Sequence, residues 1–414
     1  MISRPKTKLL AVALLALSAG ILIPDVAYAH GEKALEPFIR MRTIQWYDVQ
    51  WTRGEVEVND EVTITGKFHV AEDWPRSVPN PAETFLNVSS PGPVFIRTER
   101  YLNGRPWVSS AALKLGGDYD FKIVLKARVP GTFHIHPFFN LRDAGQVMGP
   151  GHWIEVSGSP DAFTNPVTTL DGEIIEMESY GLVNGVFWHV FWIALGSAWL
   201  LWWVRRPLFI PRFKMLQSGS DEALITPFDK RIATLILVGV PLVVFAAHSL
   251  RQSRYPNTIP LQAALDQIDP LPQRVNDGTV QVREIRTVYR VPRRSMELEL
   301  EIENASDHAI RISEFASASL RFLSSESDFG DASNVDVAEP IARTGLTVKP
   351  SDPIQPGEIR TVLVSAADAL WETEKLDGLF RDADSRFGGL LFFYNASGGR
   401  HVTSIASAVI PKFD

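Results

Sequence analysis

The sequence predicts a mainly β protein in which two β-sandwich domains are joined by a transmembrane α-hairpin. Two observations support this prediction. Short segments that alternate apolar with polar residues, separated by Pro and Gly turns, occupy both ends of the chain, as in β-sandwiches. Between them lie two uncharged apolar runs, each long enough to cross a bilayer as a helix.

The N-terminus has the features of a secretory signal peptide. Three basic residues precede an apolar run over residues 9–23, and Ala27-Tyr28-Ala29 forms an A-x-A cleavage site. An uncleaved anchor helix is the alternative, but the apolar run is short for a bilayer span. We therefore expect residues 1–29 to be removed, which makes His30 the first residue of the mature protein.

The first domain is expected over residues 30–180. Residues 62–70 alternate apolar with polar side chains, which predicts a half-buried strand. Residues 121–129 and 131–138 predict two further strands, hinged at Pro130-Gly131.

The hairpin is expected over residues 181–252, with transmembrane helices over about 183–204 and 232–250. The segment between the two helices holds six basic residues, namely Arg205, Arg206, Arg212, Lys214, Lys230 and Arg231. The positive-inside rule places this segment in the cytoplasm, although Arg251 and Arg254 at the opposite end weaken the contrast. Both domains then face the periplasm or lumen bounded by a bacterial inner or intracytoplasmic membrane.

The second domain is expected over residues 265–414. Apolar and acidic residues alternate strictly over 296–303, and a Pro-Gly turn at Pro356-Gly357 leads into a strand over 359–365. Its histidines, His308 and His401, have no partner at a metal-ligand spacing, so a structural role is expected for this domain.

Composition excludes several classes of function. The chain has 414 residues, a net charge of −7 and no basic cluster that would bind nucleic acid. It contains no cysteine, which excludes disulfides, iron–sulfur clusters, thiolate zinc and a blue-copper centre. A bound metal must therefore use imidazole, amine or oxygen ligands.

The candidate metal ligands lie in a single strand and at the mature N-terminus. Strand alternation places Phe133 and Ile135 on one face and His134 and His136 on the other. Such a pair alone is as often two solvated histidines as a metal site. His30 would add an α-amine and an imidazole, giving the four-nitrogen tetragonal set that Cu(II) prefers.

Each of the other candidate site residues has a simpler alternative role. Glu32 is either an acceptor for a ligand histidine or bound water, or an ordinary surface carboxylate. His69 falls on the polar side of its strand, which favours a surface histidine. Met148 and His152 are expected in the core and in a loop. His189 lies inside the first apolar run, which predicts a partner helix or an interior site, whereas His248 is expected to reach the interface.

Several separated sequence blocks carry a family resemblance. They are His30-Gly31-Glu32, Glu36-Pro37-Phe38-Ile39-Arg40-Met41-Arg42-Thr43, Gln45-Trp46-Tyr47-Asp48, Gly66-Lys67-Phe68-His69, Ala71-Glu72-Asp73-Trp74-Pro75-Arg76, Asp143-Ala144-Gly145, Gly149-Pro150-Gly151, Asn184-Gly185, Phe187-Trp188-His189, Ser385-Arg386-Phe387-Gly388-Gly389-Leu390 and Val409-Ile410-Pro411. Through them the chain resembles the B subunit of the copper-dependent membrane monooxygenases, the particulate methane and ammonia monooxygenases. The blocks run from the mature N-terminus almost to the end of the chain.

The resemblance implies two cupredoxin-like domains and a complex with A and C subunits that assembles as a trimer of heterotrimers. His30, with its amine, and His134 and His136 match the copper ligands of the family, and Glu32 matches a nearby carboxylate. Some members bind a second copper between two histidines. His69 matches one of them and Gln45 stands in place of the other, so this second site is expected to bind copper weakly or not at all. Residues 133–140 resemble the methane branch more closely than the ammonia branch.

The leading hypothesis is the copper-binding B subunit of a monooxygenase that converts methane to methanol with O2 and quinol-derived electrons. The alternatives are the B subunit of ammonia monooxygenase, which forms hydroxylamine from ammonia, a periplasmic copper-binding or copper-delivery module, and a scaffold whose histidines are solvated. No ligand cluster is apparent in the apolar runs. This favours oxygen activation in a partner subunit, and no catalytic residue is assigned here.

Overall fold

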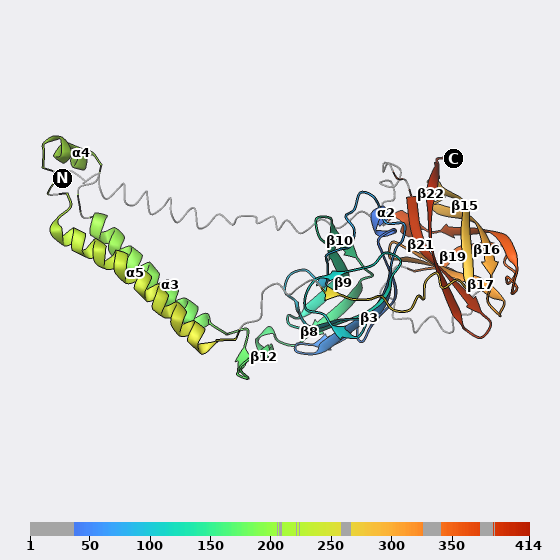
Figure 1. Ribbon diagram of the computed structural model, residues 1–414, viewed down its shortest axis with the longest axis horizontal. Coiled ribbons are helices and arrows are strands. Elements are labelled where there is room, and N and C mark those ends of the chain that lie inside the picture. The colour runs from blue at the N-terminus through green and yellow to red at the C-terminus, as the bar shows by residue number, and fades with distance from the viewer. Residues whose placement is uncertain are drawn as a thin grey trace.

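The computed structural model describes residues 37–204, 206, 209–220, 222, 224–257, 266–325, 341–372, 384 and 386–414. The predicted signal peptide, His30 and Glu32 lie outside the described residues. Two β units, a helical hairpin and a small two-stranded sheet account for most of the described elements (Figure 1). This arrangement confirms the predicted fold class, a mainly β chain with two candidate membrane helices.

The first β unit, called the two-sheet unit below, packs two sheets face to face. One sheet has the order β1 (Ile44–Trp51), β3 (Glu61–Val70), β8 (Asp118–Ala127), β5 (Phe95–Leu102) and β6 (Arg105–Pro106). The other has the order β14 (Asp266–Gln267), β7 (Ala111–Ala112), β4 (Thr84–Ser89), β9 (Gly131–Leu141), β11 (His152–Ser157) and β2 (Glu55–Glu57), with β10 (Gly145–Met148) paired to β9. A short helix, α2 (Pro37–Arg40), precedes β1.

An aromatic cluster joins the two sheets of this unit. The ring of Phe139 on β9 lies 4.8 Å from that of Phe68 on β3 and 5.2 Å from that of Trp46 on β1, centroid to centroid. Such contacts between large side chains contribute packing energy beyond the apolar area that they bury. The inward face of β9 is thus fixed to the core, and its outward face is left for polar residues.

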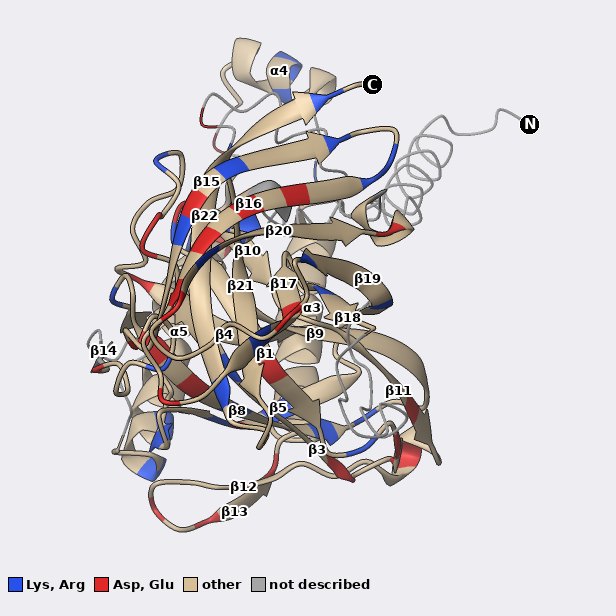
Figure 2. Cartoon of the chain, turned by 90° about the vertical axis from the view of Figure 1, so that its right-hand side faces the viewer, with Lys and Arg blue, Asp and Glu red and all other residues tan. Residues whose placement is uncertain are grey.

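The second β unit is a closed barrel. Its strands follow the order β15 (Val280–Arg290), β16 (Ser295–Asn304), β20 (Ile359–Ala367), β19 (Ile341–Lys349), β18 (Leu320–Ser324), β17 (Ile310–Ser317), β21 (Arg386–Asn395) and β22 (Arg400–Lys412). The apolar residues of β16 are buried, as their alternation predicts, and acidic and basic residues recur along β15 and β16 (Figure 2). Closure is a finding that the strand pattern did not predict.

The two β units share a polar junction, called the β junction below. Arg400 on β22 makes two hydrogen bonds to Asp48 on β1, at 2.7 and 2.6 Å, and Lys67 Nζ lies 2.9 Å from the same carboxylate. Burial acts to raise the pKa of Asp48, but the hydrogen bonds and charges of Arg400 and Lys67 outweigh it and lower the pKa to about 2. Asp48 is therefore ionised in the folded protein at every ordinary pH.

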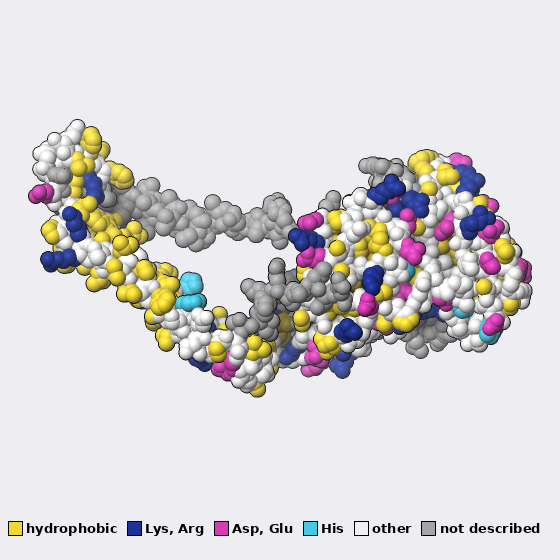
Figure 3. Space-filling view, in the orientation of Figure 1, with side chains coloured by type: hydrophobic (Ala, Val, Ile, Leu, Met, Phe, Trp, Pro, Cys, Tyr) yellow, Lys and Arg dark blue, Asp and Glu magenta, His cyan; other side chains and the backbone are white. Residues whose placement is uncertain are grey.

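Helices α3 (Leu182–Val204) and α5 (Pro227–Arg254) form the hairpin, and α4 (Ile210–Gln217) lies in the connection. Both are long and apolar enough to cross a bilayer, and hydrophobic side chains cover their surface (Figure 3). Helix α5 begins five residues before the predicted span because Thr226 caps it through a capping box with Asp229. Asp229 also accepts hydrogen bonds from Trp202 and Arg206, which ties α5 to the end of α3.

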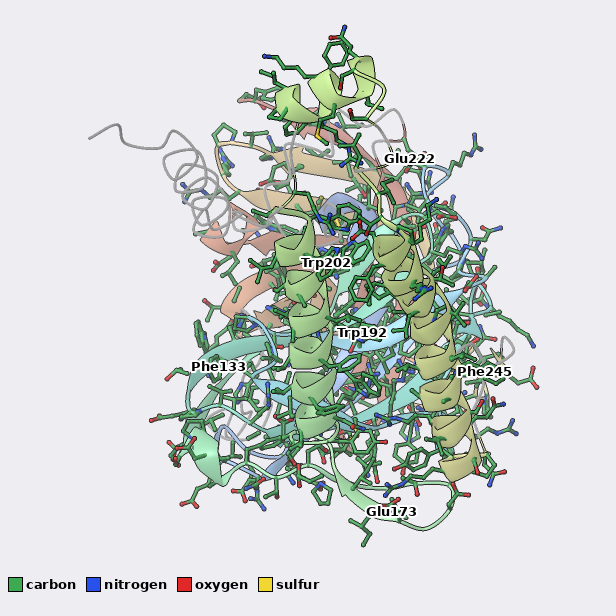
Figure 4. All side chains as sticks on the ribbon, turned by 90° about the vertical axis from the view of Figure 1, so that its left-hand side faces the viewer. Phe133, Glu173, Trp192, Trp202, Glu222 and Phe245 are labelled. Carbon is green, nitrogen blue, oxygen red and sulfur yellow. The ribbon has the colours of Figure 1, made fainter. Side chains whose placement is uncertain are left out.

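At its other end the hairpin meets a small two-stranded sheet, β12 (Pro166–Thr168) and β13 (Ile174–Glu176), which follows the short helix η1 (Pro160–Ala162). Figure 4 shows Glu173 at this end of the helix pair and Trp202 and Glu222 toward the other. A second short helix, η4 (Ala369–Glu372), follows β20.

Candidate metal centre

Strand β9 presents His134 and His136 on its outer face. Ile135 between them is fully buried, and Phe133 is half-buried against the core, so the predicted alternation is confirmed. Strands β4 and β11 flank β9 and place Ser89 opposite His136 and Trp153 opposite His134. Because β9 is paired along both sides, the two imidazoles project from a rigid part of the sheet.

The two imidazoles converge on one point. His134 Nδ1 lies 3.0 Å from His136 Nε2, and the ring planes are inclined by 88°. His136 Nδ1 lies 2.9 Å from the carbonyl oxygen of Gly149. A carbonyl only accepts hydrogen bonds, so His136 carries its proton on Nδ1 and turns the lone pair of Nε2 toward His134.

This geometry fits two ligands of one metal ion. With metal–imidazole bonds of about 2.0 Å, two nitrogens 3.0 Å apart subtend about 97° at the metal. That angle is near the right angle between neighbouring ligands in the tetragonal nitrogen sites of Cu(II). The hydrogen bond from His136 to the Gly149 carbonyl is the kind of support that fixes the tautomer and ring orientation of a metal ligand.

Both pKa shifts keep the pair in its metal-binding form. Burial lowers the pKa of His134, and the charge of His152 lowers it further. Burial also lowers the pKa of His136, against the opposing hydrogen bond to Gly149, with His134 and Arg40 adding to the decrease. A metal binds neutral imidazole, so these shifts reduce competition from protons near neutral pH.

Two residues around the pair were not predicted from the sequence. A Cβ atom on Gly151 would clash with Cε1 of His136 and would lie 2.7 Å from Cε1 of His134, so the backbone here closes tightly over both rings. The indole of Trp153 is 62 % exposed, and its ring centroid lies 4.8 Å from that of His134. The Gly149-Pro150-Gly151 segment was the available signal, because glycine often marks a close approach of the backbone.

The pair has no third ligand within the described part of the chain. There, no group of three His, Asp or Glu side chains is placed to hold a metal ion. The predicted third ligand, His30, and the predicted hydrogen-bonding carboxylate, Glu32, lie outside the described residues, so both stay predictions.

The expectation that His69 is a surface histidine is wrong. His69 is fully buried, and its Nδ1 lies 2.8 Å from Oδ1 of Asp118. Asp118 Oδ2 accepts the backbone N–H groups of Arg274 and Val275. Burial acts to raise the pKa of Asp118, but these hydrogen bonds outweigh it and lower the pKa. Chain from the second half of the sequence thus covers the polar face of β3.

Gln45 stands directly opposite His69 in the ladder between β1 and β3. Its amide nitrogen donates to the Met41 carbonyl at 3.0 Å, and its amide oxygen accepts from Ser404 Oγ at 2.9 Å. Among the described residues, His69 Nε2 has no hydrogen-bond partner. Gln45 and His69 are thus side by side in a buried site, and weak copper binding there stays a prediction.

Of the remaining described histidines, His152 lies near the pair, and its charge acts on His134. The others lie apart from it. His152 is the first residue of β11 rather than a loop residue, and its ring packs 5.5 Å from Trp51. His189 is exposed on α3, and its Nδ1 lies 2.7 Å from the Gly185 carbonyl one turn earlier. His401 lies 3.7 Å from Asp277, while His248 and His308 are exposed. Met148, predicted in the core, is only half-buried.

Comparisons with known proteins agree on a family. A family model for the B-subunit protein of monooxygenases matches residues 31–413. The chain is 45 % identical over 399 residues to a protein of Methylococcus capsulatus (strain Bath) named particulate methane monooxygenase alpha subunit, covering 96 % of this chain and 95 % of that one.

Among solved structures, the cupredoxin domain of amoB from Nitrosocaldus yellowstonii matches with a TM-score of 0.24 and 18 % identity, over 29 % of this chain and 90 % of that one. The family model covers nearly the whole chain, and the relative is aligned almost from end to end. The chain therefore belongs to the B-subunit family of monooxygenases and is one component of a membrane monooxygenase.

Proposed function

We propose that this chain is the copper-binding component of a membrane monooxygenase that hydroxylates methane to methanol, with O2 as oxidant and quinol as the electron source. His134 and His136 bind one Cu(II) together with the imidazole and the α-amine of His30. The observation that carries the proposal is the 3.0 Å approach of His134 Nδ1 to the lone-pair-bearing Nε2 of His136 on an outward strand face.

The residues of this chain hold and shield the metal. His136 is fixed by its hydrogen bond to the Gly149 carbonyl, and Gly151 leaves the backbone close to both rings. Trp153 covers one side of His134 without burying it, so the site stays open to a further ligand. When bound, copper supplies one-electron redox chemistry. The chain itself contributes binding, orientation and a neutral ligand pair.

We further propose a supporting rather than an oxygen-activating role for this copper. The pair lies on the two-sheet unit, whereas methane is apolar and partitions into the bilayer. Within the described parts of α3 and α5, His189 and His248 are the only histidines, and His189 bonds to its own helix. Oxygen activation is accordingly assigned to a partner, the A or C subunit, in a trimer of heterotrimers.

The proposed topology follows the predicted domains. Residues 30–180 and 265–414 form cupredoxin-like domains on the periplasmic or lumenal side, and residues 181–252 cross the membrane twice. Cleavage after Ala29 is required, because only then does His30 offer a free amine. Mass spectrometry of the mature N-terminus tests this requirement directly, and a chain that retains residues 1–29 would refute the four-nitrogen set.

The main test compares copper in the purified membrane complex with that in a His134→Ala/His136→Ala variant. We expect the variant to lose one copper per chain and the tetragonal, nitrogen-ligated Cu(II) signal in electron paramagnetic resonance. His308→Ala, which removes an exposed histidine of the barrel, is the matched control and should keep both.

Turnover then separates the hypotheses. Loss of the signal together with reduced methane oxidation supports a metal that the complex requires, and methane rather than ammonia as the better substrate supports the methane branch. Unchanged copper content and an unchanged signal in the double variant would refute the site. A chain that purifies without A and C subunits and without oxidase activity would favour a copper-delivery module instead.

A further inference from the structure

A cavity lies where the hairpin meets the two-stranded sheet. It has a volume of about 640 Å³ and is bounded by the β12–β13 turn, the start of α3 and the end of α5. Glu173 marks this end of the helix pair in Figure 4. The turn is held against the segment after α5 by a hydrogen bond from Asn257 to Asp171 at 2.7 Å. The cavity is thus built at one mouth of the apolar hairpin.

Two guanidinium groups line this cavity. Arg251 and Arg254 are three residues apart on α5, so they lie on the same side of the helix. Arg251 donates to the neutral hydroxyl of Tyr180 at 3.2 Å, and no carboxylate among the described residues pairs with it. Arg254 lies 3.3 Å from Glu173, but both side chains are exposed, and such pairs contribute little. Glu176 also lines the cavity, but its Oε1 accepts the backbone N–H groups of Asn165 and Glu178. Arg251 therefore has unused capacity for an anion, while Arg254 shares its charge with Glu173 through an exposed pair.

The other side of the cavity is apolar and faces outward from the helix pair. Val183 and Leu250 line it and are 86 % and 73 % exposed, and the half-buried Trp188 lies nearly two turns into α3. Aromatic residues at this depth are typical of the boundary between headgroups and acyl chains. A ligand that fills the cavity must be anionic at one end and apolar at the other.

The distribution of basic residues along the hairpin also indicates an anion at this end of the helix pair. Basic residues concentrate in the connection between α3 and α5, which is the end that the positive-inside rule assigns to the cytoplasm. Arg251 and Arg254 lie at the opposite end, against that trend. A fixed anion of the membrane beside them would account for this exception.

We propose that this cavity binds a phospholipid of the surrounding bilayer, with its phosphate against Arg251 and Arg254 and an acyl chain along Val183, Trp188 and Leu250. Arginine is the residue best suited to a phosphate, because its planar fork donates two parallel hydrogen bonds. A quinol fits the apolar side but carries no charge for two guanidinium groups. The inference uses the membrane hairpin alone and does not depend on the metal centre.

The test counts phospholipid in the detergent-purified complex by phosphorus assay and by mass spectrometry of the intact assembly. We expect Arg251→Gln/Arg254→Gln to lose one tightly held phospholipid per chain. The charge-conserving Arg251→Lys/Arg254→Lys variant should keep most of it. Glu173→Gln, which removes the carboxylate beside Arg254, should hold it at least as firmly.

A charge-matched control lies on α4, in the connection between the two long helices. Arg212→Gln/Lys214→Gln removes the same charge outside the cavity and should leave the count unchanged. Equal losses from both double variants would indicate a general effect of charge on boundary lipid and would overturn the proposal. So would an unchanged count in Arg251→Gln/Arg254→Gln, or quinone lost in place of phospholipid.

A partner chain is the remaining occupant to test. The native chain has no cysteine, so Ser179→Cys places a single thiol at the cavity. Efficient cross-linking of this thiol to another subunit would show that protein covers the cavity, and would overturn the proposal. Copper content should be the same in all these variants, which separates this outcome from failure of the metal centre.

Discussion

Replacing Gly151 with alanine should disable the metal centre while leaving both histidines in the sequence. The added Cβ would clash with Cε1 of His136, and would lie 2.6 Å from Nδ1 of that ring and 2.7 Å from Cε1 of His134. These distances are far below van der Waals contact, so both rings must rotate or the backbone must move. Either change breaks the hydrogen bond to the Gly149 carbonyl or the 3.0 Å approach of the two nitrogens.

The expected loss is that of a supporting residue beside a metal ligand. Removing such support typically costs about 10- to 100-fold in metal affinity, or roughly 1.4 to 2.8 kcal/mol. The assay is competition for Cu(II) between the copper-depleted complex and a chelator of known affinity, with electron paramagnetic resonance of the loaded sample. The resonance should change as well, because the ligand geometry changes.

Gly54→Ala is the matched control for Gly151→Ala. Its Cβ would approach His152 at 3.3 Å and would touch neither His134 nor His136. We expect this variant to bind copper with the native affinity. If Gly151→Ala also bound copper with native affinity and an unaltered resonance, the close approach of the backbone would have no role in the site.

Three further predictions test the junction, the core and the metal contact. Asp48→Asn should destabilise the protein by about 2 kcal/mol at neutral pH. Because folding lowers the pKa of Asp48, this difference in stability is complete above pH ~4 and fades as the pH falls toward 2. Thermal unfolding measured against pH checks this dependence. Phe139→Ala should cost about 3–5 kcal/mol in the same assay, since its ring is fully buried between the sheets, and a loss below 1 kcal/mol would contradict that packing. Adding Cu(II) to the copper-depleted complex should quench a fraction of the tryptophan fluorescence that Trp153→Phe removes, because the indole lies beside His134; identical quenching in both proteins would place the metal elsewhere.

Features of the site and of the fold that depend on neighbouring residues in the chain could be predicted from the sequence. Alternation alone placed His134 and His136 outward and Ile135 inward, because the side-chain period of a strand is fixed by its backbone. The spans of α3 and α5 followed from their uncharged apolar runs, apart from the two ends of α5. A cap extends its first turn past charged residues, and its last turn continues to Arg254.

Local sequence patterns did not predict contacts between residues that lie far apart in the chain. His69 lies on the polar side of β3, and polarity normally indicates solvent, but Asp118 and the backbone of Arg274 and Val275 cover that side. Those covering groups lie 49 to more than 200 positions away in the chain. Closure of the barrel likewise depends on β15 pairing with β22, two strands at opposite ends of its sequence.

The β junction also makes the last strand a condition for finishing the first β unit. Arg400 and Ser404 on β22 are synthesised about 350 residues after β1, yet they bind Asp48 and Gln45 on that strand. A chain truncated before β22 would leave the half-buried Asp48 carboxylate with Lys67 as its remaining cation, and the Gln45 amide oxygen without its Ser404 donor. Incomplete chains therefore have unsatisfied polar groups on β1, which would expose the first β unit to proteolysis before such chains compete for partner subunits.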